Sequence, residues 1–275
     1  MKTSLFIGTE DMPDLSYVYV FSDTVEKNVA TAARLGFDAV ELLIGDPDLF
    51  NEEAFRVSLK ETGAEAACIN TGRLMSQLGL TLIHADAAIR SSAFEKLQQL
   101  VELCGRLGCA LNIGLFRGAA IEGQPIARTK AMFVDVLKRA CEFASQHGVG
   151  INFEPTNRFE TNFIQTTGEG LEIIDRVGMP NLGLLIDLYH MYIEDDDLYE
   201  SIVRAGDRIR HVHFSDSDRW PPGVSHGELD FPRIIGLLKA VGYDGYLSVG
   251  LVRSDDAEEC ARKTASYLKA LIREA

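Results

Sequence analysis

The chain alternates between short apolar runs rich in β-branched residues and longer segments with helical periodicity. Each apolar run is followed by a polar loop, an amphipathic stretch and a turn that contains glycine. Because the runs are continuously apolar, they predict strands buried on both faces, as in a parallel sheet. Eight such runs are present: Ser4–Gly8, Ala39–Gly45, Ala64–Thr71, Ala110–Phe116, Gly150–Thr156, Leu182–His190, Ile209–Asp216 and Gly245–Leu251.

The segments between the runs predict helices with one apolar face. Ala93–Leu107, for example, places Leu97, Leu100 and Val101 on the same side. Several of these segments end at a glycine, which readily adopts the left-handed conformation that closes a helix. The same periodicity occurs in Arg128–His147, Asp230–Val241 and Ala257–Arg273.

Eight strand–helix units with short return turns predict a single closed (β/α)8 barrel, an α/β fold, that forms one domain over residues 1–275. A doubly wound sheet is the alternative, but it would have fewer strands and a glycine-rich phosphate loop. The segment Asn112–Gly118 does not have the spacing of such a loop. In a barrel, functional side chains are expected at the carboxyl ends of the strands.

Composition narrows the possible partners. The 27 Lys and Arg residues against 41 Asp and Glu residues leave a net charge of −14, which argues against nucleic acid, since phosphate backbones are bound by clustered cations. No apolar stretch reaches the ~18 residues of a membrane helix, and the first residues do not form a secretion signal. Five cysteines without paired spacing predict a reduced, cytoplasmic protein.

Metal-ligand side chains lie near the ends of three consecutive runs, where each strand is expected to give way to a loop. Glu154 lies in the fifth run, Asp187 in the sixth and His213 in the seventh. Because neighbouring strands of a barrel end at the same mouth, the three are expected to converge. Two carboxylates and one imidazole suit Mn²⁺, Co²⁺, Fe²⁺ or Mg²⁺, with Zn²⁺ as a further option. The alternative role of each carboxylate is to cap the next helix.

The remaining histidines have simpler interpretations. His211 and His213 are expected to point to opposite sides of their strand, which leaves a structural role for His211. His226 is expected in an exposed loop, and His147 at a helix end beside the last carbonyl groups.

At these strand ends the chain resembles the sugar isomerase/epimerase branch of the xylose-isomerase-like barrels. That branch includes ketose 3-epimerases, inosose isomerases, hydroxypyruvate isomerases and L-xylulose-5-phosphate 3-epimerases. The resemblance covers nearly the whole chain and rests on Gly36–Glu41, Asn112–Gly118, Glu154–Glu160, Asp187–His190, His213–Arg219 and Gly242–Gly250.

The resemblance implies that Glu154, Asp187 and His213 bind a divalent metal, with Mn²⁺ as the first choice, and that Glu154 is also a catalytic acid/base. It also implies a small sugar or sugar phosphate as substrate, and a homo-oligomer. Residues that match contacts to the substrate's hydroxyls and oxyanion are Glu160, His190 and Arg219. Asn157 and Arg117, near strand ends, are added as further candidates for substrate contact.

The chain departs from the family at Gly250, where the resemblance leads us to expect a glutamate that is both the fourth metal ligand and the second catalytic carboxylate. The implied chemistry is proton transfer through a cis-enediolate. Epimerisation needs groups on both faces of that intermediate, whereas aldose–ketose isomerisation can use one. Three possibilities stay open: a three-ligand site completed by water, a carboxylate supplied by Asp255 or Asp256, or a sugar-binding relative without turnover.

A further enzyme class shares the barrel and the Asp187-x-x-His190 pattern, namely the apurinic endonucleases. Such an enzyme needs a zinc cluster with more histidines than this chain places at its strand ends. Cys68, Asn70 and Glu41 lie where those histidines would be expected. A DNA-repair enzyme would also need a basic groove, so a sugar isomerase or epimerase is the favoured interpretation.

Overall fold

The computed structural model describes residues 1–9, 18, 19, 21, 23–252 and 256–274. Its eight parallel strands close into a barrel in chain order, and one strand overlaps each predicted apolar run, so the predicted (β/α)8 fold is confirmed and the doubly wound sheet is not formed. The barrel strands are β1 (Lys2–Gly8), β3 (Ala39–Leu43), β4 (Glu65–Asn70), β5 (Ala110–Ile113), β6 (Ile151–Phe153), β7 (Leu182–Asp187), β8 (Ile209–His213) and β9 (Tyr246–Val249).

The first strand closes the barrel because it pairs on both sides. In β1, Ser4 is opposite Ala39 of β3 on one side and Ser248 of β9 on the other. A second, antiparallel pair joins β2 (Val18–Tyr19) to β10 (Leu251–Val252), so backbone pairing holds the chain immediately after Gly250.

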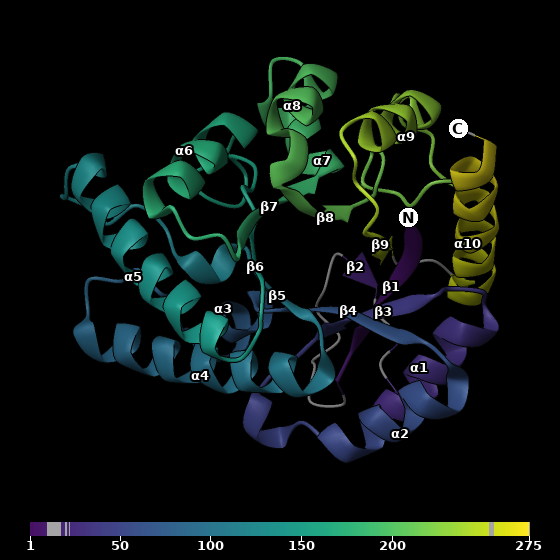
Figure 1. Cartoon of the computed structure of the whole chain (residues 1–275), viewed down its shortest axis with the longest axis horizontal. Helices are drawn as coiled ribbons and strands as arrows, with labels where there is room; N and C mark the ends of the chain where they lie inside the picture. Colours follow the sequence, from purple (N-terminus) through teal and green to yellow (C-terminus); the bar gives the residue numbers. More distant parts are fainter. Residues whose placement is uncertain (10–17, 20, 22, 253–255, 275) are drawn as a thin grey trace.

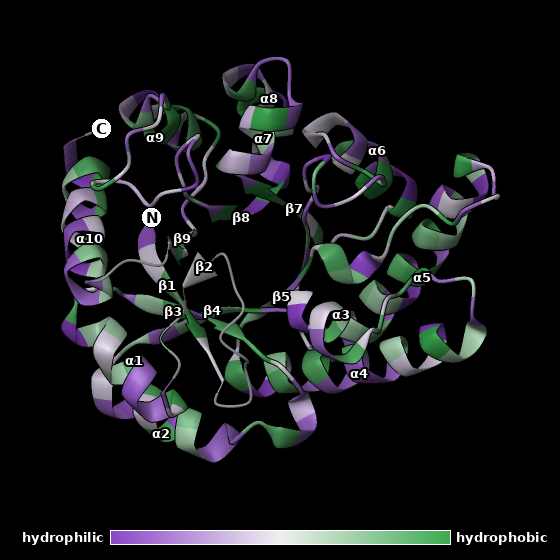
Figure 2. Cartoon of the chain, turned by 180° about the vertical axis from the view of Figure 1, so that it is seen from behind, coloured by the Kyte–Doolittle hydropathy of each residue, from purple (hydrophilic) through white to green (hydrophobic). Residues whose placement is uncertain are grey.

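Helices surround the barrel (Figure 1). In Figure 2 they carry intermixed hydrophobic and hydrophilic residues, as expected for elements with one buried face. Within the described ranges, none of them combines the length and the apolar character needed to cross a bilayer. The α-helices are α1 (Val25–Arg34), α2 (Glu52–Thr62), α3 (Gly72–Leu78), α4 (Ala87–Leu107), α5 (Ile126–Gln146), α6 (Thr167–Val177), α7 (Leu188–Glu194), α8 (Leu198–Ala205), α9 (Phe231–Ala240) and α10 (Ala257–Glu274).

Two of the apolar runs continue from their strand into a helical turn. The run over residues 182–190 stops being a strand at Asp187, because the Asp187 side chain caps α7 by accepting hydrogen bonds from the backbone N–H groups of Tyr189 and His190. His190 is therefore helical. The run over residues 110–116 ends as a strand at Ile113 and continues into a short 3-10 turn, η2 (Leu115–Arg117).

The core lies between the strands and the helices, and it includes Leu97, Leu100 and Val101 of α4, as their spacing predicts. Inside the barrel the packing is partly polar. Asn112 donates to Glu41 over 3.0 Å, and Asn152 donates to Asn112 over 2.8 Å. A buried polar group is tolerated when it is hydrogen-bonded, so these side chains form a connected network under the barrel mouth. All five cysteines are free thiols.

Candidate active site at the carboxyl ends of the strands

The three predicted metal ligands meet at the barrel mouth. His213 Nδ1 lies 3.2 Å from Glu154 Oε1 and 3.5 Å from Asp187 Oδ2. Asp187 and His213 are paired across β7 and β8, and Glu154 follows β6 directly, with its backbone N–H bonded to Ile113. The three side chains are only 7–13% exposed. One ring nitrogen and two carboxylate oxygens that face one another fit the ligand set of a divalent cation.

The two carboxylate oxygens of Asp187 make different contacts. Oδ1 accepts the backbone hydrogen bonds that cap α7, at 2.9 Å from Tyr189 N and 3.3 Å from His190 N. Oδ2 faces His213 Nδ1 and also lies 3.8 Å from His190 Nε2. The sequence predicts capping and metal binding as alternative roles. In the structure, Oδ1 caps the helix while Oδ2 remains directed at His213, so one role does not exclude the other.

The charges of these groups support one another. Burial by itself would raise the pKa of Asp187, but His190, His213 and Arg219 outweigh it and hold that pKa well below its usual range. Burial would lower the pKa of His213, but Glu41 and Glu154 outweigh it and hold that pKa well above its usual range. Asp187 is therefore an ionised carboxylate that can accept a cation.

Both histidines of β8 point into the barrel, which corrects the expectation that they diverge. His211 Nε2 lies 2.8 Å from Glu41 Oε2, and His213 Nε2 lies 3.0 Å from Glu41 Oε1. The physical reason is that side chains alternate from one residue to the next, so residues two apart share a face. Burial opposes ionisation of Glu41, but the two histidines hold its pKa well below the usual range.

His190 completes the polar side of the site. Its Nε2 lies 3.8 Å from Glu154 Oε1, and its Nδ1 lies 2.8 Å from the Asn157 side-chain amide. Asn157 is buried behind His190, and it is not among the residues that line the cavity. The structure thus places Asn157 where it orients His190, whereas His190 itself faces the cavity.

Arg219 and Glu160 line the cavity as an ion pair. Arg219 Nη1 lies 2.8 Å from Glu160 Oε1, and the guanidinium carbon lies 4.9 Å from the centre of the Tyr189 ring. Arg219 adopts a left-handed backbone with φ of 66°, which a residue other than glycine rarely does. Backbone hydrogen bonds at Asp216 hold this turn. The constrained turn aims the guanidinium at the cavity.

Glu154, Asp187, His190, His213, Glu160 and Arg219 all line one cavity of about 230 Å³. Gly250 lines it too, so the position at which the resemblance leads us to expect a glutamate lies at the cavity. Asp256 caps the start of α10, where its carboxylate accepts a hydrogen bond from Glu259 N, and Asp255 lies outside the described residues. Cavity residues that sequence reasoning missed include Phe6, Asn70, Arg73 and Met75.

The missed residues differ in how they could have been found. Phe6 and Asn70 lie in the last part of β1 and β4, so the rule that sites lie at strand ends would have found them. Arg73 and Met75 lie on α3, whose position over the barrel mouth is a tertiary property.

Arg117 lies behind the site and does not line the cavity. It is fully buried, and it donates to the backbone carbonyls of Glu154, Phe163 and Ile164 and to the Thr156 hydroxyl. Burial lowers the pKa of Arg117 to about 10. Because its hydrogen bonds hold the segment that carries Glu154, the structure places Arg117 as a support for Glu154, in contrast to the expectation that it contacts the substrate.

Three other residues lie at the surface or at loop positions. Arg158 is exposed and pairs with Glu194 at 2.8 Å. His226 is exposed, as expected. The Trp220 backbone N–H is bonded to Asp218, and its side chain is half-buried outside the cavity lining.

Gly114 provides a test of the Glu154 carboxylate. A Cβ at Gly114 would overlap Glu154 Oε2, so Gly114→Ala should push that carboxylate away from His213. A displacement of about 1 Å is costly for a group that must be precisely placed. We therefore expect Mn²⁺ affinity to fall by about 10-fold or more, in the range seen when a residue that orients a metal ligand is removed. Calorimetry on metal-stripped protein measures this. Gly236→Ala, where a Cβ meets nothing within 4 Å, is the control. Unchanged affinity in Gly114→Ala would show that Glu154 does not hold the metal.

Comparison with known proteins finds sugar epimerases among the relatives of this chain. An L-ribulose 3-epimerase from Methylomonas sp. (strain DH-1) is 32% identical over 232 residues, which cover 80% of this chain and 75% of that protein. A ketose 3-epimerase from Arthrobacter globiformis is 28% identical over 234 residues, which cover 82% and 76%. The crystal structure of a D-allulose 3-epimerase from Methylomonas sp. matches with a TM-score of 0.80 and 25% identity over 98% of both chains.

The family described as the xylose isomerase-like TIM barrel matches residues 29–271. Relatives of this chain are named as sugar epimerases, and others as putative hydroxypyruvate isomerases. The protein is therefore a member of the xylose isomerase-like TIM barrel family, and its relatives include sugar epimerases and isomerases.

Proposed function

We propose that this protein is a divalent-metal-dependent sugar isomerase or epimerase that transfers a proton beside a carbonyl group. The observation that carries the proposal is the convergence of His213 Nδ1 with the Glu154 and Asp187 carboxylates inside a cavity. The sugar epimerases among its relatives support the same class of reaction.

Glu154, Asp187 and His213 would hold the cation, with Mn²⁺ as the first choice and Co²⁺, Mg²⁺, Fe²⁺ or Zn²⁺ as alternatives. When bound, the cation would supply polarisation of the substrate carbonyl. Glu154 takes the proton from the neighbouring carbon and returns it, so the substrate passes through a cis-enediolate. The Arg219–Glu160 pair and His190 orient the hydroxyl groups, because all three line the cavity.

Gly250 favours transfer on one face of the enediolate. Epimerisation requires a second proton-carrying group opposite Glu154, and position 250 lines the cavity without a side chain that could act. A single carboxylate suffices to move a proton between adjacent carbons on the same face. We therefore propose aldose–ketose isomerisation as the main reaction, with epimerisation suppressed.

Hydrogen exchange in D2O tests for chemistry. Metal-loaded protein incubated with L-ribulose or D-allulose should place deuterium beside the carbonyl, as seen by ¹H NMR, and Glu154→Gln should stop this exchange. The aldose product should exceed the 3-epimer. A product mixture dominated by the 3-epimer would refute the one-face reaction.

One observation favours a second function, a sugar-binding protein without turnover. Position 250 has a glycine in place of an expected catalytic carboxylate, whereas Glu160, His190 and Arg219, the residues proposed to contact the sugar, are present. The same experiment separates the two functions, since binding without deuterium exchange supports the noncatalytic role.

The surroundings of the site favour a neutral sugar over a sugar phosphate. Arg219 is paired with Glu160, and Arg117 and Arg158 are occupied by other groups. A second cavity of about 320 Å³ shares Met75, Leu115 and Glu160 with the first. Within the described part of the chain, its lining includes Glu122 and Glu160 but no lysine or arginine. A phosphate dianion placed there would be repelled.

Comparison of matched substrates tests this preference. We expect an unphosphorylated ketose to react with a kcat/KM at least ~10-fold above that of its phosphate, equivalent to about 1.4 kcal/mol of discrimination. Steady-state kinetics with ribulose and ribulose 5-phosphate measure the ratio. Arg73 and Arg219 both line the cavity. A higher kcat/KM for the phosphate than for the neutral ketose would contradict the proposal, and its loss in Arg73→Met would assign the phosphate contact to Arg73.

We further propose that the chain forms a homo-oligomer, as the family resemblance implies. Phe159 is 79% exposed on the loop that also carries Glu160, which makes this loop a candidate contact surface. Sedimentation analysis tests the assembly. Cytoplasmic location, expected from the cysteine content, remains a prediction.

A further inference from the structure

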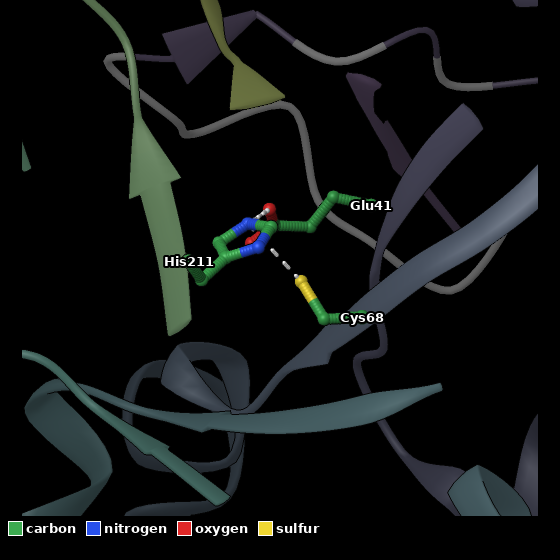
Figure 3. Close-up of side chains that lie close together, drawn as sticks. All are labelled: Glu41, Cys68 and His211. Carbon is green, nitrogen blue, oxygen red and sulfur yellow. Dashed lines mark hydrogen bonds and ion pairs between the residues drawn. The ribbon is translucent and has the colours of Figure 1, made fainter. Parts of the chain in front are cut away.

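Glu41 is a fully buried carboxylate at the centre of the barrel. Its Oε1 lies 3.0 Å from His213 Nε2, and its Oε2 lies 2.8 Å from His211 Nε2. The side-chain amides of Asn112 and Asn70 also donate to Oε1, over 3.0 Å and 3.3 Å. Figure 3 shows Glu41, Cys68 and His211 converging from β3, β4 and β8. Among the described residues, each of these hydrogen-bond partners of the carboxylate is a group that can donate.

The two nitrogens of His213 therefore face different partners. Nε2 faces Glu41, whereas Nδ1 faces Glu154 and Asp187. A carboxylate accepts but does not donate, so Glu41 requires a proton on His213 Nε2. When Nε2 keeps its proton, Nδ1 is the nitrogen that can present a lone pair to a cation.

We infer that Glu41 is a positioning residue that fixes the tautomer and the ring orientation of His213 for cation binding through Nδ1, and that His211 holds Glu41 in place. This inference rests on the proposed metal dependence. An outer carboxylate that accepts from a ligating imidazole orients the ring and raises its basicity. His211 serves this arrangement by occupying the second oxygen of Glu41, which leaves Oε1 directed at His213.

The same cluster has a different possible use, as a second cation site made of Glu41, Cys68 and His211. The contacts argue against that use. His211 Nε2 is engaged by Glu41, and Cys68 Sγ accepts a hydrogen bond from Asn112 over 2.9 Å. Burial, followed by the Glu41 carboxylate, raises the pKa of the Cys68 thiol well above its usual range, whereas a metal binds the thiolate. The network satisfies its polar groups without an ion.

Mn²⁺ titration calorimetry on metal-stripped protein tests the inference. Glu41→Gln keeps the shape of the side chain but can turn a donor toward His213, and it should weaken Mn²⁺ binding by ~10–100-fold. Cys68→Ser is the matched control, because Cys68 Sγ lies in the same network, 3.4 Å from His211 Nε2, whereas the ring nitrogens of His213 face Glu41, Glu154 and Asp187. This variant should bind one Mn²⁺ per chain with unchanged affinity.

Two results would contradict the positioning role of Glu41, and a third, distinguishable from them, would contradict the proposed metal dependence. Equal affinity in Glu41→Gln and wild type overturns the positioning role. Two cations in wild type, one of them lost in Cys68→Ser, overturns it in favour of the second cation site. No Mn²⁺ binding by wild type refutes the metal dependence of the proposed function itself.

A measurement on wild type removes any dependence on how Glu41→Gln folds. In ¹⁵N-histidine-labelled protein titrated with diamagnetic Zn²⁺, we expect His213 Nε2 to carry a proton before and after metal addition. The Nδ1 resonance alone should shift to that of a metal-bound nitrogen. A metal-bound or unprotonated Nε2 overturns the inference.

Discussion

Asp187→Asn should lower Mn²⁺ affinity by at least ~100-fold, the upper end of the loss seen when support of a metal ligand is removed, while the cap of α7 is retained. The reason is that the two oxygens of Asp187 have different partners. Oδ1 caps α7, and asparagine caps a helix about as well as aspartate. Oδ2 faces His213, and the substitution removes the negative charge that attracts the cation.

Calorimetry with Mn²⁺ and thermal unfolding of the metal-free protein measure the two effects. Asp197→Asn is a matched control, because Asp197 caps α8 in the same way through Tyr199 N and Glu200 N but lies outside the cavity lining. Asp187→Ala should also lose the cap, at a cost of about 1 kcal/mol of unfolding free energy. If Asp187→Asn bound Mn²⁺ as wild type does, Asp187 would be a helix cap and nothing more.

Gly250→Glu should tighten Mn²⁺ binding by ~10-fold or more, since affinity for hard cations rises with the number of charged oxygen ligands. Position 250 lines the cavity that holds Glu154, Asp187 and His213. The new carboxylate would also stand as a second proton-carrying group, so the share of 3-epimer among the products should increase.

Gly250→Gln is the control for this gain, because it adds a side chain of the same size without the charge. It should fill the cavity without tightening Mn²⁺ binding. Combining Gly250→Glu with Asp187→Asn should recover part of the affinity lost in the single variant. Equal affinity and equal product ratios in Gly250→Glu, Gly250→Gln and wild type would show that position 250 does not correspond to the fourth ligand.

Much of the barrel mouth could be predicted from the chain. The position of Glu154, Asp187 and His213 at the ends of three successive apolar runs was sufficient, because parallel neighbours in a barrel must end on the same side. The error at His211 was local, since residues two apart on a strand share a face. The sequence also predicts the run over residues 182–190 as one strand. The structure ends the strand at Asp187 and begins α7 at Leu188, and the apolar residues on both sides of Asp187 do not by themselves distinguish a strand from a helix.

Other roles depend on long-range contacts that no local pattern contains. Arg117 is a strand-end arginine in the sequence, and only the packing of the segment over residues 154–164 turns its donors toward carbonyl groups. Asn157 is likewise next to the expected site, but the fold places it behind His190.

By itself, the sequence determined the eight-unit barrel, the end at which the site lies and the absence of a carboxylate side chain at position 250. These properties follow from short-range periodicity and from residue identity. The tertiary structure alone decided that Glu41 meets His213 across 172 residues of chain, that Asp187 divides its oxygens between a cap and the site, and that Arg117 supports Glu154 from behind. The physical reason is that hydrogen-bond partners of buried polar groups are chosen by which side chains the closed barrel brings together, not by their spacing along the chain.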